Sequence, residues 1–382
     1  MESRERVLTA LDHREPDRVP RDCAGTRYSS IHAEAYRRLR PAMGLSADEP
    51  VIVDISQGLA RVDEDVLSRF ETDVALVSPG PPAGYRREIT RDDEAERFVD
   101  EWGVVRSRPL GGLYFESSSA PLAGDIDETD VATFAWPDGG DPARVRGLAD
   151  EARRIHAEEG RAVVVGTLCA GLSEMHFRLR GYEDGYLDLA ADPALARRVM
   201  GRVLEVKLAY WEQVLAALGD QIDVAAEADD LGAQFAPLFS PATYRQVVKP
   251  LHAELCRYIH EHSRARVFLH SCGAIRELVP DLIEIGVDIL NPVQVSATGM
   301  DTAGLKAEFG SDIAFWGGAV DPQGVLARGT PDDVRAEVRR RVADLMPGGG
   351  FVFASVHNIQ ADVPPENVLA MWEVIEEVGS YG

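Results

Sequence analysis

A histidine and a cysteine stand two residues apart in the segment Arg266-Val-Phe-Leu-His-Ser-Cys-Gly273. Residues 266–269 have the apolar character of a short buried strand, and the glycine at the end of the segment marks a turn. Alternate side chains of an extended segment point to the same side, so His270 and Cys272 can be directed at one point. Imidazole and thiolate are typical zinc ligands, although an isolated pair of this kind is more often structural.

The elements that must position this pair alternate along the chain. Eight apolar runs have strand character, at residues 51–55, 74–78, 162–168, 222–226, 267–269, 287–290, 313–316 and 351–355. Helical patterns lie between most of them, at residues 193–218, 241–262, 274–285, 302–309 and 331–346. Eight strands that alternate with helices predict an α/β fold, the (β/α)8 or TIM barrel.

Two parts of the chain stand outside this alternation. Residues 1–50 predict an N-terminal helical extension, with helices near residues 3–12 and 29–45. Residues 79–160 contain Gly/Pro clusters and short aromatic runs, which indicate an inserted, hairpin-rich excursion that ends in a helix near 142–159. No linker composition separates it, so we expect one domain over residues 1–382; a separate small domain is the alternative.

Polar side chains follow nearly every predicted strand, where barrel enzymes place their active sites. They are Gln57 after the first strand, Glu227, Asp229 and Asp230 after the fourth, His270 and Cys272 after the fifth, Asn291 and Gln294 after the sixth, Asp321 and Gln323 after the seventh, and His357, Asn358 and Gln360 after the eighth. His270, Cys272 and His357 would give a metal three protein ligands and leave one position open, as in catalytic zinc sites.

The other strand-end residues have two interpretations each. Asp229 or Asp230 would complete the metal shell or handle a proton, but an aspartate at a strand end also caps helices, and adjacent side chains usually diverge. We therefore expect only one of the two to face the metal. Gln57 and Asn291, together with Gln294 and Asn358, would orient a substrate; the alternative is that such amides satisfy loop backbone. His176 lies in a polar helical stretch and is expected at the surface.

The composition excludes several classes of partner. The chain has 382 residues and a formal net charge of −24, which argues against binding to nucleic acid or to anionic membranes. Four cysteines are too few for a disulfide framework. The N-terminus is charged, and no run approaches a membrane span, so a cytoplasmic protein is expected. A homodimer is compatible with the sequence, which leaves the oligomeric state open.

Three motifs carry a family resemblance: His270-Ser-Cys-Gly-Ala-Ile, the run Gly286-Val-Asp-Ile-Leu-Asn-Pro-Val-Gln294, and Gly348-Gly-Gly-Phe. In combination they resemble the uroporphyrinogen decarboxylase superfamily, and more narrowly its cobalamin-dependent methyltransferase branch. The resemblance implies a barrel and a zinc ion held by a His-X-Cys pair and a later ligand. In the branch that methylates a thiol, the later ligand is a cysteine. This chain has no cysteine after Cys272, and His357 is the nearest substitute.

A histidine in place of a thiolate makes the metal a stronger Lewis acid and favours an oxygen or nitrogen substrate over a thiol. The resemblance thus implies a zinc-dependent methyltransferase that works with a corrinoid, in a direction that the sequence leaves open. No Asp-X-His-X-X-Gly pattern is present, so the corrinoid is expected on a separate protein. The alternatives are a metal-free uroporphyrinogen-type decarboxylase, another metal-assisted lyase or hydrolase, and a non-catalytic binder.

Overall fold

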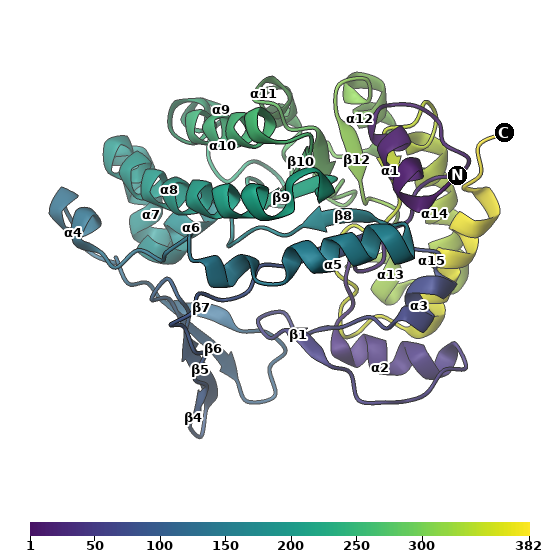
Figure 1. The fold of residues 1–382 in the computed structure, drawn as a ribbon, viewed down its shortest axis with the longest axis horizontal. Helices are drawn as coiled ribbons and strands as arrows, with labels where there is room; N and C mark the ends of the chain where they lie inside the picture. The colour runs from purple at the N-terminus through teal and green to yellow at the C-terminus, as the bar shows by residue number, and fades with distance from the viewer.

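Seven parallel strands form one curled sheet in the computed structural model, which describes all residues from 1 to 382 (Figure 1). Their order in the sheet is β13-β12-β11-β10-β9-β8-β3, and every neighbouring pair is parallel. The strands are β3 (Val74–Val77), β8 (Ala162–Val165), β9 (Val224–Ala228), β10 (Arg266–His270), β11 (Ile289–Asn291), β12 (Ala314–Trp316) and β13 (Phe351–Val352). The predicted barrel fold and seven of its eight predicted strands are confirmed.

The prediction that residues 51–55 form the first barrel strand is wrong. Its core, β1 (Ile52–Asp54), pairs in antiparallel fashion with β2 (Leu59–Ala60) outside the barrel, and Val53 is 62% exposed. Residues 20–22 occupy the gap between β13 and β3 instead. The Phe353 amide donates to the Pro20 carbonyl at 2.8 Å, and the Asp73 amide donates to the Arg21 carbonyl, also at 2.8 Å. Because a proline in this short segment has no N–H, residues 20–22 do not have a strand-like sequence.

The barrel interior is closed at one end by the N-terminal helix. Fifteen buried residues form the interior cluster, and most of them come from alternate positions of the strands. Val7 and Leu11 of α1 (Ser3–Leu11) belong to this cluster, and the Gly350 amide donates to the Ala10 carbonyl just before β13. Helix α1 therefore covers the N-terminal ends of the strands. Tyr28 also belongs to the interior cluster and contacts residues of β10.

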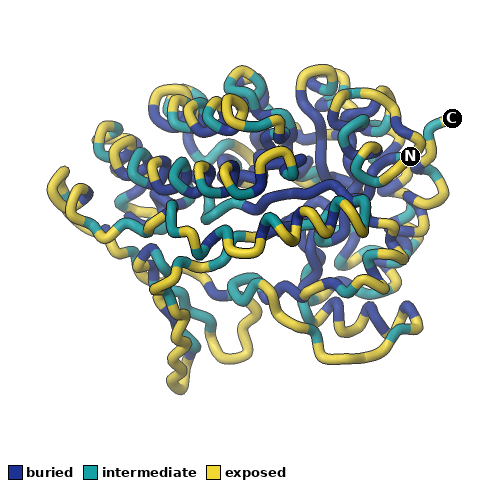
Figure 2. The backbone as a smooth tube through the Cα atoms, viewed as in Figure 1, coloured by how far each residue is buried: buried dark blue, intermediate teal, exposed yellow.

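Helices surround the sheet and bury one face each, as the alternation of buried and exposed positions in Figure 2 shows. The elements outside the excursion are α2 (Ala33–Ala42), α3 (Glu64–Arg69), α6 (Leu172–Arg180), α7 (Tyr182–Ala191), α8 (Pro193–Leu218), α9 (Pro241–Thr243), α10 (Lys249–His262), α11 (Val279–Glu284), α12 (Thr302–Phe309), α13 (Val325–Arg328), α14 (Pro331–Leu345) and α15 (Pro365–Val378). None of the helices has both the length and the apolar composition that crossing a membrane requires.

The excursion after β3 is hairpin-rich, as its turn residues indicate. Four antiparallel strands project from the barrel in Figure 1: β4 (Thr90–Arg91), β5 (Ala95–Val99), β6 (Val105–Pro109) and β7 (Glu116–Ser119). The chain returns through α4 (Glu128–Thr133), α5 (Leu148–Arg154) and a π-helical turn (Ile155–Glu159). Trp102 and Val104 pack in the same hydrophobic cluster as the outer layer of the barrel. This packing holds the excursion against the barrel.

Candidate metal centre

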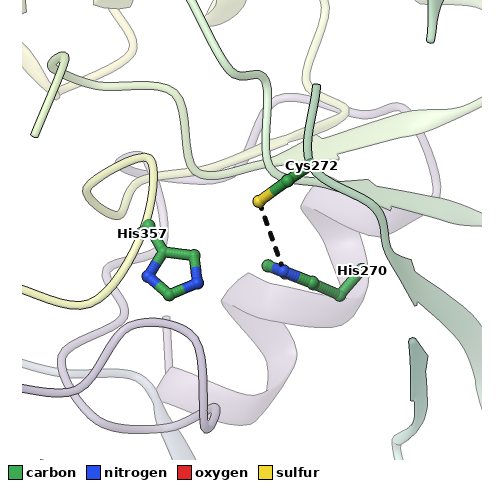
Figure 3. A group of neighbouring side chains, drawn as sticks. All are labelled: His270, Cys272 and His357. Carbon is green, nitrogen blue, oxygen red and sulfur yellow. Dashed lines mark hydrogen bonds between the residues drawn. The ribbon is translucent and has the colours of Figure 1, made fainter. Parts of the chain in front are cut away.

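His270, Cys272 and His357 converge at the C-terminal ends of the strands (Figure 3). One potential ligand atom from each residue lies within 4.8 Å of those of the other two. The Cys272 Sγ is 3.5 Å from Nε2 of His270, and the two imidazole rings have centroids 5.5 Å apart. The sequence predicted these three residues as a ligand set, and the structure brings them together.

His270 is held by the register of its strand. It is the last residue of β10 and pairs with Asn291, the last residue of β11, so the two side chains stand side by side. The Asn291 Oδ1 lies 2.6 Å from Nδ1 of His270, and its Nδ2 donates to the Trp316 carbonyl at 2.8 Å. Asn291 is therefore committed to protein partners and orients the His270 ring; it does not present its amide to a substrate.

Cys272 lies in a short turn that four hydrogen bonds fix. The Cys272 amide donates to Asp230 Oδ1 at 2.8 Å, and the Gly273 amide donates to Gln294 Oε1 at 2.7 Å. Gly273 has a φ of +93°, and a Cβ there would meet the backbone of Gly232 at 2.2 Å, so only glycine fits. In the other two bonds, the Leu231 amide donates to Ser271 Oγ at 3.0 Å, and the Ala274 amide donates to the Ala233 carbonyl at 2.8 Å. Gln294 thus supports the metal-ligand turn.

His357 follows β13 in a loop that a second pair of amides positions. The Asn358 Oδ1 accepts from the Ser30 amide at 2.9 Å, and the Asn358 Nδ2 donates to Gln57 Oε1 at 2.7 Å. Gln57 comes from the turn between β1 and β2, not from a barrel strand. The predicted substrate-orienting residues Gln57 and Asn358 therefore brace the loop that carries the third ligand.

The protonation states of the three residues suit a metal. Burial lowers the pKa of His270 to about 4 and that of His357 to about 3, so both imidazoles are neutral at pH 7 and have a free lone pair. Burial raises the pKa of the Cys272 thiol well above its usual value, so the thiol is protonated until a metal displaces the proton. Two neutral imidazoles and a thiol directed at one point are the donor set of a zinc site.

The adjacent aspartates diverge, as expected. Asp229 is fully buried and holds the N-terminus of α6: its carboxylate accepts from Ser173 Oγ at 2.6 Å and lies 2.9 Å from His252 Nε2. It is directed away from the ligand triad, so the geometry gives it a structural role. Asp230 faces the triad, with Oδ1 3.7 Å from His270 Nε2. Burial raises the pKa of the Asp230 carboxyl group above its usual value.

Two residues near the triad were not predicted from the sequence. Glu174, in the first turn of α6, accepts from the Asp230 amide at 3.3 Å, and burial together with repulsion from Asp230 raises the pKa of Glu174. Tyr28 stacks on His270 with ring centroids 3.7 Å apart. Glu174 follows the third strand at the start of the next helix, a position that could have indicated it. Tyr28 depends on the path of the N-terminal segment, which no periodicity predicts.

Two other polar residues lie elsewhere than the sequence suggested. His176 is wholly buried, not at the surface, because it faces Asp188 and the Gly185 carbonyl between α6 and α7. Glu227 points out of the barrel toward α8, where it pairs with Lys207 Nζ at 2.5 Å and accepts from Trp211 Nε1 at 2.6 Å. These groups stabilise the helix layer and do not reach the triad.

A cavity of about 910 Å³ opens beside the triad. Its lining includes Tyr28, Leu76 and Ala226, which belong to the barrel interior, and Tyr85 and Arg87 from the excursion. The triad itself does not line the cavity; Tyr28 contributes to the cavity wall and also contacts His270. A ligand that reaches Tyr28 in this cavity would therefore lie close to His270, because the Tyr28 ring stacks on the His270 ring.

Comparisons with known proteins show the family to which the chain belongs. The family model for uroporphyrinogen decarboxylase (URO-D) matches residues 113–378. The uroporphyrinogen decarboxylase of Ralstonia nicotianae is 31% identical over 316 residues, which cover 76% of this chain and 78% of that protein. The uroporphyrinogen decarboxylase of Alkalilimnicola ehrlichii is 24% identical over 98% of this chain and 94% of its own.

Among solved structures, a methyltransferase from Methanosarcina mazei matches 99% of both chains with a TM-score of 0.66 and 18% identity. At this identity the match establishes a shared fold. The family model and the Ralstonia relative together cover most of the chain, from the excursion to the last helix. The chain is a member of the uroporphyrinogen decarboxylase family.

Proposed function

We propose that this protein is a zinc-dependent methyltransferase that moves a methyl group between a small O- or N-methylated substrate and a corrinoid carried on a separate protein. The observation that carries the proposal is the convergence of His270, Cys272 and His357 within 4.8 Å at the mouth of the barrel. A thiol substrate is less favoured, because a site with two imidazoles and one thiolate is a stronger Lewis acid than one with two thiolates.

The chain's own residues have defined tasks in this proposal. Zinc, when bound by the triad, would supply a Lewis acid that stabilises charge on the heteroatom of the methylated group. The corrinoid would supply or accept the methyl group. Asn291 keeps the lone pair of His270 directed at the site, and Asp230 holds or releases the proton that the heteroatom gains or loses. The Tyr28 ring limits access of water to His270 on one face.

Decarboxylation of a porphyrinogen is the main alternative, and the curated relatives bear that name. Such a substrate carries eight carboxylates, which need unpaired cationic groups around them. The arginines of the cavity are largely neutralised by the protein itself. The pairs are Arg27–Asp54, Arg144–Glu101, Arg154–Glu159 and Arg161–Glu64. A cavity in which four of the six arginines are already paired supports a neutral substrate better than a polyanion.

The test is methyl transfer with free corrinoid. Zinc-loaded protein is mixed with reduced cobalamin and, separately, with methanol, methoxybenzene or trimethylamine, and the absorbance of methylcobalamin is followed. We expect methylation from at least one donor, a loss of at least 100-fold in Cys272→Ala, and normal rates in Cys256→Ala, whose thiol is buried in α10 and is not part of the triad. Release of CO2 from uroporphyrinogen, with no methyl transfer, would replace the proposal with the decarboxylase.

The remaining alternatives give different outcomes in the same assay. A metal-assisted lyase or hydrolase would consume a donor without any corrinoid. A non-catalytic binder would show no turnover, and Cys272→Ala would retain its ligand affinity. Turnover that requires both zinc and corrinoid separates the proposed methyltransferase from both.

A further inference from the structure

Tyr28 has an unusual position between the metal ligands and the cavity. The residue is 8% exposed, and its ring is nearly parallel to that of His270, with an interplanar angle of 11°. A second stacking contact, with ring centroids 6.1 Å apart, joins it to Phe268 in the barrel interior. These contacts fix the plane of the ring, so the direction of its hydroxyl group is fixed as well.

The Tyr28 hydroxyl has no partner in the protein. Its backbone amide donates to Thr26 Oγ1 at 3.2 Å, but its phenolic oxygen makes no hydrogen bond to another protein group. The phenolic oxygen is not fully buried and retains accessible surface. Because Tyr28 lines the 910 Å³ cavity, that accessible surface faces the cavity. A nearly buried hydroxyl without a protein partner is available to a ligand.

The cavity indicates what kind of ligand this is. Its volume is typical of sites for drug-sized molecules and far exceeds what methanol or methylamine needs. Of its 36 lining residues, 16 are hydrophobic, and four of the six arginines among the rest form ion pairs with acidic residues of the same lining, as described above. The lining therefore favours a molecule with an apolar body and no net charge.

We propose that the Tyr28 hydroxyl donates a hydrogen bond to an oxygen of a neutral, methylated substrate with an apolar body, and thereby positions that substrate beside the metal ligands. The hydrogen bond itself is independent of the metal, whereas the identity of the ligand as a methyl donor rests on the proposed function. Tyr28 is thus the residue that connects binding in the cavity with chemistry at the triad.

The test is a binding cycle with two probes of nearly equal shape. Methoxybenzene carries an ether oxygen, and ethylbenzene has a methylene group in the same place. Affinities are measured by calorimetric titration on wild type, Tyr28→Phe and Tyr85→Phe, each with zinc and after chelation. Tyr28→Phe keeps the stacked ring and removes only the oxygen. Tyr85→Phe is the matched control, since Tyr85 lines the same cavity but its hydroxyl already donates to the Val99 carbonyl at 3.1 Å.

We expect Tyr28→Phe to weaken methoxybenzene by about five- to tenfold, the usual value of one hydrogen bond, and to leave ethylbenzene unchanged. Tyr85→Phe should leave both affinities unchanged. Equal effects of Tyr28→Phe on the two probes, or no binding of either probe to wild type, would overturn the inference. If the binding results are as expected but no methyl transfer occurs, the proposed function is refuted and Tyr28 remains a ligand-binding residue.

Discussion

Asn291 Oδ1 and His270 Nδ1 lie 2.6 Å apart at the ends of neighbouring strands. The amide cannot be reversed, because its Nδ2 donates to the Trp316 carbonyl at 2.8 Å. The Oδ1 must therefore accept, and His270 must carry its proton on Nδ1. The lone pair is then on Nε2, the atom that faces Cys272 at 3.5 Å. A single buried asparagine thus selects the tautomer that can bind a metal.

Loss of this amide should weaken metal binding. We expect Asn291→Leu to lower zinc affinity by about 10- to 100-fold, because the imidazole loses both its orientation and its preferred tautomer. A competition titration with a chromophoric chelator measures the change. The control is Asn367→Leu, since Asn367 is equally buried and donates to the Leu326 carbonyl far from the triad. Equal affinity of Asn291→Leu and wild type would show that the amide has no part in metal binding.

Zinc should also stabilise the fold. The triad joins the end of β10 to the loop after β13, two segments separated by two strands of the sheet. A ligand that binds only the folded state stabilises it by mass action, so chelation should lower Tm by about 5 °C. Scanning calorimetry with and without chelator measures the shift, and Cys272→Ala should show none. An unchanged Tm after demonstrated metal removal contradicts the bridging geometry.

The two adjacent aspartates should behave differently. Asp229→Ala should lower the free energy of unfolding by about 3 to 5 kcal/mol, because it leaves His252 and the amides at the start of α6 without their buried partner. Asp230→Asn keeps the acceptor for the Cys272 amide, so stability should change little while methyl transfer falls by about 100-fold or more. Urea unfolding and the corrinoid assay separate the two effects. If Asp229→Ala lowered methyl transfer and Asp230→Asn lowered stability, the two assigned roles would have to be exchanged.

Stability should depend on pH through Asp22. Asp22 belongs to the segment that completes the barrel, and its buried carboxyl group accepts a hydrogen bond from Trp316 Nε1 at 2.7 Å; burial raises its pKa from 3.8 to about 6. The folded state then binds the Asp22 proton more tightly than the unfolded state, so the contribution of Asp22 to stability is fully present below about pH 4 and declines as the pH rises to 6. The decline attributable to Asp22 is about 3 kcal/mol.

Asp22→Asn removes this titration, so the slope of unfolding free energy between about pH 4 and 6 should become less negative than in wild type. Urea unfolding at several pH values measures both slopes, and the slope comparison is insensitive to a constant loss of stability in the variant. Parallel curves for the two proteins would mean that Asp22 is ionised in the fold throughout this range.

The sequence predicts the barrel and the metal ligands for the same reason. Strand and helix periodicity is local, and Cys272 follows the last strand residue, His270, by two positions, so their common direction follows from local chain geometry. His357 could be added because strand ends meet at one edge of the barrel. Residues 20–22 could not be recognised as part of the sheet, since their pairing depends on hydrogen bonds to Phe353 and Asp73 across the whole chain.

The roles of the polar strand-end residues were harder to predict than their presence. Asn291 and Gln294 were expected to orient a substrate, but register and turn geometry commit them to His270 and to the Gly273 amide. Tyr28 was missed because a non-periodic segment places it over the barrel. Local sequence thus indicates which groups gather, while long-range packing decides which of them meets the metal and which supports it.

Metal content measured by elemental mass spectrometry tests the central claim most directly. Wild type, Cys272→Ala, His357→Ala and the control Cys256→Ala are purified without added metal and without chelators. We expect about one zinc per chain in wild type and in Cys256→Ala, and near-complete loss in Cys272→Ala and His357→Ala. Wild type that contains no zinc and takes none up at neutral pH, or His357→Ala that retains full occupancy, would contradict the three-residue site.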